Sequence, residues 1–150
     1  MNVLLSIKPK YTELIKSGLK KYEFRRKIFK KSGGCKVFIY STSPVKKITG
    51  VFDASIIHED SPYRIWDMFG EYSGISQEEY FRYFKNCKTA FAIEIKNLVI
   101  FDKPHDPSKY FLEFTPPQSY RYFNPRQNFL PLDKRSTADE SYDGGLSVHP

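Results

Sequence analysis

The sequence has few cysteines and no long hydrophobic run. Cys35 and Cys87 lie far apart and in no C-x-x-C motif, which excludes a disulfide framework and favours two reduced thiols in the interior of a cytoplasmic protein. No apolar segment approaches the roughly 18 residues that a membrane helix needs. The first residues also lack the basic start and long apolar core of a signal peptide. We therefore expect a cytoplasmic protein that has no membrane partner.

Histidine and the common nucleotide-binding motifs are also scarce. His58, His105 and His149 are scattered, and no cysteine lies near any of them, so the ligand spacing of a zinc site is missing. The chain has no G-x-G-x-x-G, no P-loop and no G-x-S-x-G motif, which removes support for a dinucleotide, nucleoside triphosphate or serine hydrolase site. We expect neither a metal ion nor a cofactor.

The length and composition are those of one folded domain. The chain has 150 residues, of which 40% are hydrophobic and 17% aromatic, and a domain of this size buries roughly 70% of its unfolded surface. Hydrophobic periodicity is lost after about residue 124. We therefore predict a folded domain over residues 1–123 and a C-terminal extension over residues 124–150 that is partly disordered, most clearly from residue 136 onward.

Strand-like and helix-like patterns alternate along this domain. Pro9 suits the first turn of a helix that ends at Gly18, and two further helical segments fall between residues 60 and 86, where Ser76 begins a capping box. A turn is expected at residues 32–34. Strands are predicted over residues 3–7, 21–28, 36–40, 47–57 with a bulge at Gly50, 89–96 and 98–101. Together these elements predict an α+β domain built on a small β-barrel with helices inserted between its strands.

Positive charge is concentrated in one segment. Residues 20–47 contain ten Lys or Arg and a single acid, Glu23, so that this segment carries +9 while the rest of the chain sums to −2. A charge confined to one segment predicts a local positive field that attracts phosphate groups. The alternative is a solvated basic hairpin that only keeps the protein soluble.

Within this segment Gly18, Lys20, Glu23 and Arg25 form the pattern G-x-K-x-x-E-x-R. In a strand that starts at about residue 21, Glu23 and Arg25 share one face, and the intervening aromatic residues take the other. Lys20 reaches the polar face only if the chain bends before the strand. Burial of this polar triad is costly unless its members pair or meet a ligand. The alternative is a surface strand with an ion pair of little energetic value.

A second group of polar and aromatic residues follows two prolines at residues 116–117. Gln118 and Ser119 can hydrogen-bond to base edges, and Arg121 can bridge to phosphate. The alternative is a proline-rich strap that packs its tyrosines on the barrel.

The G-x-K-x-x-E-x-R pattern resembles the motif of ASCH domains, a PUA-like family. The resemblance extends through residues 4–9, 20–26, 39–45 and 116–121 to the small prokaryotic and phage-type members, and it covers about residues 3–123. It implies a small PUA-like β-barrel wrapped by helices, with the motif on the wall of a cleft that binds RNA or another nucleic acid.

The same resemblance implies possible enzymatic activity. One ASCH group hydrolyses the acyl amide of N4-acetylcytidine with a Lys, a Thr and a Glu, and other members are ribonucleases. Lys20 matches the catalytic Lys, Glu23 stands where those enzymes have the Thr, and no residue near Ser73 matches their Glu.

Two functional hypotheses follow, together with a plain alternative. The first is a nucleic-acid-binding module for RNA or a single strand, in which Glu23 orients Arg25. Its proposed contact residues are Lys20, Lys21, Glu23, Arg25, Arg26, Gln118, Ser119 and Arg121. The second is a hydrolase of a modified nucleoside or a ribonuclease with Lys20 and Glu23 as the catalytic pair, although the ion pair would raise the lysine pKa and oppose its activation. The plain alternative is an interaction domain whose cleft is vestigial.

Overall fold

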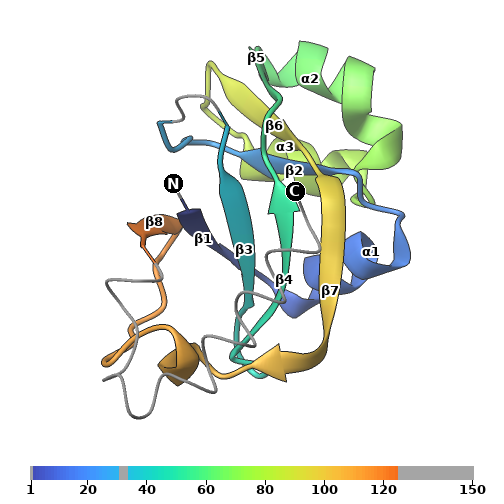
Figure 1. Cartoon of the computed structure of the whole chain (residues 1–150). Helices are drawn as coiled ribbons and strands as arrows, with labels where there is room; N and C mark the ends of the chain where they lie inside the picture. The colour runs from blue at the N-terminus through green and yellow to red at the C-terminus, as the bar shows by residue number, and fades with distance from the viewer. Residues whose placement is uncertain (1, 31–33, 125–150) are drawn as a thin grey trace.

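The computed structural model describes residues 2–30 and 34–124. In this part of the chain, two β-sheets are accompanied by three α-helices and two 3-10 turns (Figure 1). In chain order the elements are β1 (Asn2–Ile7), α1 (Pro9–Ser17), β2 (Tyr22–Arg25), β3 (Lys36–Ser41), β4 (Lys47–Asp53), β5 (Ile57–Asp60), α2 (Pro62–Phe69), η1 (Gly70–Tyr72), α3 (Gln77–Tyr83), β6 (Ala90–Glu94), β7 (Lys96–His105), η2 (Pro107–Lys109) and β8 (Tyr120–Phe123). The predicted α+β class is confirmed.

The larger sheet has the strand order β7-β4-β3-β1-β8. Its central pair, β1 and β3, is parallel, and the other pairs are antiparallel. The register shifts where Gly50 pairs with Ile39 and Ile100, which agrees with the bulge expected there. A side chain at position 50 would come within 2.6 Å of the Val99 carbonyl oxygen, so the close approach of β4 and β7 requires glycine.

The smaller sheet has the order β2-β6-β5, and the two sheets are not closed into a barrel. The predicted β-barrel is therefore wrong. The single strand expected over residues 47–57 is two strands, because the chain leaves the larger sheet after Asp53 and joins the smaller one at Ile57. In the described part of the chain, β7 and β8 end the larger sheet without pairing with each other, and closure of a barrel requires such a pairing.

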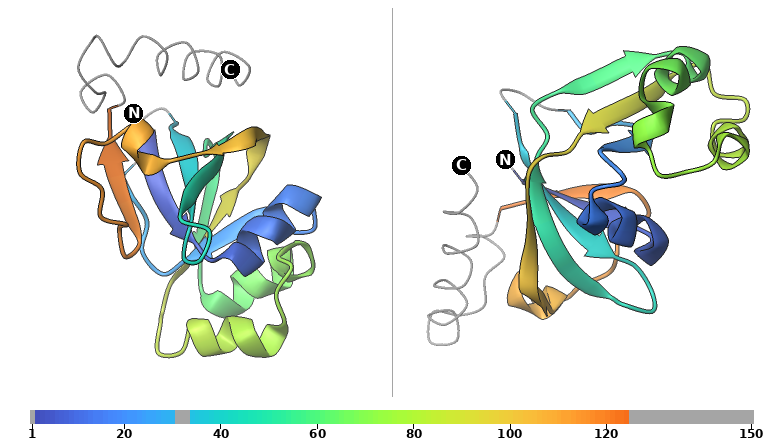
Figure 2. Two further views of the ribbon diagram at one scale, coloured as in Figure 1. Left: turned by 90° about the horizontal axis from the view of Figure 1, so that it is seen from below. Right: turned by 90° about the vertical axis from the view of Figure 1, so that its right-hand side faces the viewer.

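The two sheets are covered by different helices (Figure 2). Helix α1 packs Ile15 against Val3 and Leu5 of β1 in one hydrophobic core. Helices α2 and α3 enclose a second core, in which Ile65 and Tyr80 surround Phe24 of β2. Strand β2 and the bend before it therefore lie where α1, α3 and the smaller sheet meet.

Local sequence explains how several of these elements begin and end. Helix α1 stops at Gly18, which adopts φ of 85° and donates its N–H to the Ile15 carbonyl oxygen, as predicted. Ser61 accepts a hydrogen bond from the Arg64 N–H at the start of α2, and Ser76 does the same for Glu79 in α3. No helix among the described residues has the length and hydropathy of a membrane span. The predicted C-terminal extension over residues 124–150, apart from residue 124, and most of the turn at residues 32–34 lie outside the described residues.

Candidate functional site

One cavity, which we call the Lys20 cavity, has a volume of about 800 Å³. It is enclosed by α1, β2, α3 and the segment that precedes β8, and its size is in the range of small-ligand sites. Its lining has a net charge of +3, since five cations outnumber the two carboxylates of Glu23 and Glu79. The cations are Lys8, Lys20, Arg25, Arg26 and Lys27.

Glu23 links the two cations of the motif. Its carboxylate lies 3.5 Å from the Lys20 Nζ and 3.0 Å from an Arg25 guanidinium nitrogen. All three side chains are almost fully buried, with 3% of Lys20, 7% of Glu23 and 11% of Arg25 exposed. The bend after Gly18 is fixed by a hydrogen bond of 3.0 Å from the Lys20 N–H to the Leu14 carbonyl oxygen. This bend turns Lys20 toward the face of Glu23 and Arg25.

The Lys20 amine occupies a mixed polar and aromatic environment. Its Nζ donates a hydrogen bond of 3.2 Å to the Ser73 carbonyl oxygen and lies 5.4 Å and 5.1 Å from the ring centroids of Tyr11 and Phe24. Burial lowers the pKa of Lys20 from 10.5, and this effect outweighs the opposing attraction of Glu23. The ion pair opposes the lowering of this pKa, as the sequence suggested, but burial has the larger effect.

Arg25 ties the motif strand to the segment before β8. It donates hydrogen bonds of 2.8 Å to the Ser119 hydroxyl, 3.3 Å to the Ser119 carbonyl oxygen and 3.4 Å to the Ser6 carbonyl oxygen. Together with Glu23, these acceptors use most of the hydrogen-bonding capacity of the Arg25 guanidinium group. Arg25 therefore holds Ser119 at the cavity and has little remaining capacity to bind a ligand.

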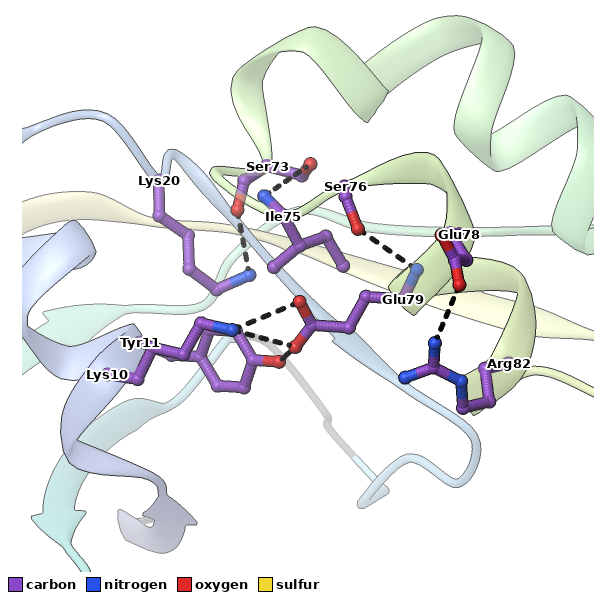
Figure 3. Close-up of polar contacts among 9 residues, drawn as sticks. All are labelled: Lys10, Tyr11, Lys20, Ser73, Ile75, Ser76, Glu78, Glu79 and Arg82. Atoms are coloured by element: carbon purple, nitrogen blue, oxygen red, sulfur yellow. Dashed lines mark hydrogen bonds and ion pairs between the residues drawn. The ribbon is translucent and has the colours of Figure 1, made fainter.

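The opposite wall of the cavity is formed by Glu79 of α3. The Tyr11 hydroxyl donates a hydrogen bond to its carboxylate, and the Lys10 amine forms an ion pair with it (Figure 3). The Lys10 Nζ lies 3.1 Å from the nearer carboxylate oxygen. Only one half of the capping box expected at Ser76 is formed. The Ser76 hydroxyl accepts a hydrogen bond from the Glu79 N–H, but the Glu79 carboxylate binds Tyr11 of α1 instead of the Ser76 N–H. Tyr11 and Glu79 were missed as site residues, since the sequence marks one as a core position of α1 and the other as part of a cap.

Six of the eight predicted contact residues line the Lys20 cavity. They are Lys20, Glu23, Arg25, Arg26, Gln118 and Ser119. Lys21 lies elsewhere, with its amine 5.9 Å from the Tyr72 ring centroid. The Arg121 guanidinium lies 4.5 Å from the centroid of the Phe111 ring. Phe111 belongs to one hydrophobic core, whereas the neighbouring Tyr120 packs against another. Alternation along β8 accounts for this separation, because neighbouring side chains take opposite faces.

Acids from other segments neutralise part of the basic segment. Lys36 forms an ion pair of 2.6 Å with Asp53, and Lys47 forms one of 3.1 Å with Asp106. At the Lys20 cavity, the exposed cations are Lys8, Arg26 and Lys27. The Arg26 guanidinium also lies 4.5 Å from the Tyr83 ring centroid. Part of the positive charge predicted from the sequence therefore remains unneutralised at this cavity.

His58 and His105 each hydrogen-bond to another side chain. His58 hydrogen-bonds to the Glu94 carboxylate at 2.8 Å, and His105 hydrogen-bonds to the Tyr110 hydroxyl at 2.6 Å. Cys35 and Cys87 form no disulfide with each other; Cys35 is buried, as predicted, whereas Cys87 is only partly buried and lines the Lys20 cavity. Over residues 2–30 and 34–124, no group of three or more His, Cys, Asp or Glu side chains is arranged to hold a metal ion.

Curated relatives include a ribonuclease and a ribosomal protein. The ASCH domain-containing ribonuclease of Zymomonas mobilis is 29% identical over 94 residues, which are 63% of this chain and 64% of that protein. The large ribosomal subunit protein uL22 of Ureaplasma parvum is 29% identical over 108 residues, which are 72% of this chain and 35% of that protein. The chain thus spans less than two thirds of the length of these relatives.

Solved structures and a family model agree on the fold. The crystal structure of ASCH from Zymomonas mobilis has a TM-score of 0.77 at 24% identity, covering 93% of this chain and 94% of that one. A point-substituted form of the same protein has a TM-score of 0.76 at 25% identity over 84% of this chain and 94% of its own. The ASCH domain model matches residues 5–99, a span that includes the whole G-x-K-x-x-E-x-R motif. The chain belongs to the ASCH domain family.

Proposed function

We propose that this domain binds single-stranded RNA in the Lys20 cavity and cleaves it there. The observation that carries the proposal is the buried Lys20 amine, whose pKa is lowered within a cavity of net charge +3. A cation-rich cavity attracts the phosphate backbone, and a lysine that gives up its proton more readily is suited to act in proton transfer. The ribonuclease name of the Zymomonas mobilis relative points to the same substrate class.

Binding begins with the exposed cations at the mouth. Lys8, Arg26 and Lys27 line the cavity and have no ion-pair partner in the described part of the chain. If these three cations neutralise three phosphates, the logarithm of the binding constant falls with the logarithm of salt concentration with a slope of about −2. Gln118 and Ser119 lie on the same lining and offer hydrogen bonds to a base or sugar.

Cleavage is assigned to the deeper part of the cavity. In its neutral form the Lys20 amine accepts the proton of a ribose 2′-hydroxyl group, whose oxygen forms a bond to the adjacent phosphorus. The bond from that phosphorus to the 5′-oxygen of the next nucleotide breaks, and the leaving oxygen takes a proton from water. The Glu23 carboxylate and the Ser73 carbonyl oxygen hold the amine in place at 3.5 Å and 3.2 Å. Glu23 is thus a positioning residue, because both of its carboxylate oxygens already face cations of the protein.

Two observations favour alternative functions. Lys20 and Arg25 are both paired with Glu23, which suits a module that binds RNA without cleaving it. Glu79 lines the same cavity as Lys20 and brings a second carboxylate to it. That arrangement suits the amidohydrolase alternative, in which a lysine and a glutamate act on N4-acetylcytidine.

The test is cleavage of labelled single-stranded RNA by the purified chain, with Lys103→Ala as the matched control. Lys103 is exposed on β7 and lines neither cavity described here. We expect the wild-type protein and Lys103→Ala to cleave alike, and Lys20→Ala to lose at least about 100-fold in rate. Lys20→Met, which keeps an apolar side chain in the buried position, repeats the test if Lys20→Ala has a lowered melting temperature.

The other outcomes separate the alternatives. Salt-sensitive RNA binding without cleavage would indicate a module that only binds RNA, and it would refute the role of Lys20 as a proton acceptor. Release of acetate from N4-acetylcytidine, with RNA left intact, would support the amidohydrolase. Failure of the wild-type chain to bind RNA in low salt would reject the proposed function entirely.

A further inference from the structure

A second cavity lies beside the first. This cavity, which we call the Tyr40 cavity, has a volume of about 590 Å³ and is formed by the turn after β3 and by the segment between η2 and β8. Thr42 lines both cavities, so the two hollows meet at this residue. The walls of the Tyr40 cavity are partly aromatic, with Phe111 and Phe114 beside Tyr40.

The Tyr40 hydroxyl is a buried polar group without a hydrogen-bond partner among the described residues. Only 3% of this residue is exposed, and its hydroxyl makes no hydrogen bond within residues 2–30 and 34–124. The two other tyrosines in the core behave differently. Tyr80 donates to the Pro62 carbonyl oxygen at 2.7 Å, and Tyr110 hydrogen-bonds to His105 at 2.6 Å. Because buried hydroxyls are almost always paired in folded proteins, a lone one on a cavity wall points to a ligand.

The surrounding groups indicate what this ligand is. The Tyr40 ring lies 5.0 Å from the Phe114 ring, which is partly exposed and offers a stacking surface. The exposed Lys46 brings a positive charge to the same cavity, while the Asp106 carboxylate there is held by Lys47. These groups match the parts of one nucleotide. The aromatic ring can stack on the base, the hydroxyl can donate a hydrogen bond to the edge of the base, and the lysine can bind the phosphate.

The Tyr40 hydroxyl keeps its proton at neutral pH. Burial raises the pKa of Tyr40, and the charge of Asp106 adds to the effect. The group is therefore available as a hydrogen-bond donor. The Arg121 guanidinium, which lies outside the Lys20 cavity, packs on the Phe111 ring at 4.5 Å and so supports a wall of this second hollow.

We propose that the Tyr40 cavity is a nucleotide subsite for the RNA strand that occupies the Lys20 cavity. The strand passes Thr42, with one nucleotide beside Lys20 and a neighbouring base held by Phe114 and the Tyr40 hydroxyl. This subsite rests on the proposed function, since it binds the same strand. Because the Tyr40 subsite binds an additional nucleotide, the affinity of the protein for RNA should depend on the length of the strand.

The test compares Tyr40→Phe with Tyr63→Phe, which removes the same hydroxyl from a residue that is 72% exposed and lines neither cavity. Binding is measured by fluorescence anisotropy with a 2′-O-methyl oligonucleotide, which lacks the attacking hydroxyl. We expect Tyr40→Phe to weaken binding about fivefold, as the loss of one hydrogen bond does. Tyr63→Phe should bind as the wild type does.

The melting temperature of the free protein distinguishes a ligand contact from a structural role. Because the Tyr40 hydroxyl has no partner in the described structure, Tyr40→Phe should melt at the wild-type temperature or above it. Equal affinity of Tyr40→Phe and wild type would overturn the subsite, and so would a lowered melting temperature with unchanged affinity. In both cases Lys20-dependent cleavage could persist, so the proposed function would stand. If the wild-type protein binds no RNA, the proposed function fails and the subsite fails with it.

Discussion

The two walls of the Lys20 cavity each present a carboxylate, but in different surroundings. On the β2 wall, 7% of the Glu23 side chain is exposed, and it pairs with two buried cations. On the α3 wall, 28% of the Glu79 side chain is exposed, and its cationic partner Lys10 is 64% exposed. The same chemical group is therefore a fixed part of the interior on one wall and an adjustable surface group on the other. Burial, rather than residue type, decides which role each carboxylate takes.

The largest effect is expected from Glu23→Gln. This change leaves the Lys20 and Arg25 charges buried without a counter-charge, and breaking one side of a buried ion pair costs about 3–5 kcal/mol. We expect a loss of this size in the free energy of unfolding, measured by urea denaturation. A loss below about 1 kcal/mol would show that solvent reaches this wall.

A second substitution tests whether Lys20 and Glu23 are directly coupled. In the Glu23→Gln protein, Lys20→Met removes one of the uncompensated charges and should restore part of the lost stability. The two substitutions should therefore be non-additive by about 1–3 kcal/mol in a double-mutant cycle. Additive effects would contradict direct coupling between these side chains.

A smaller effect is expected on the other wall. Glu79→Gln removes an ion pair with an exposed lysine, which contributes at most about 1 kcal/mol. The amide oxygen of Gln can still accept the hydrogen bond of Tyr11. If urea denaturation gives a loss as large as that of Glu23→Gln, the contrast between the two walls is wrong.

An effect that appears only at acidic pH is expected away from both walls, at His105. Burial lowers the pKa of His105 from 6.5 to about 4. Between these two pH values the imidazole is protonated in the unfolded chain and neutral in the folded one. This contribution to stability is complete above pH 6.5 and is lost as the pH falls toward 4. His105→Phe should flatten the fall in unfolding free energy across that window, and an unchanged slope would contradict the assignment.

Local sequence predicted the elements of the β2 wall and their alternation, because strand period, helix caps and the glycine stop act over a few residues. It predicted Lys20, Glu23 and Arg25 as a group for the same reason. It did not predict Glu79 opposite them or the lone hydroxyl of Tyr40, since these depend on how distant segments pack. The barrel was wrong because strand period does not reveal that the chain changes sheets between Asp53 and Ile57.

The most direct test of the account is the titration of the Lys20 amine by NMR on protein with labelled lysine, using Lys20→Arg to assign the signal. We expect a pKa below 10.5 for this amine in the free protein, and a signal that shifts when 2′-O-methyl RNA is added. A pKa at or above 10.5, or a signal that does not respond to RNA, would contradict it.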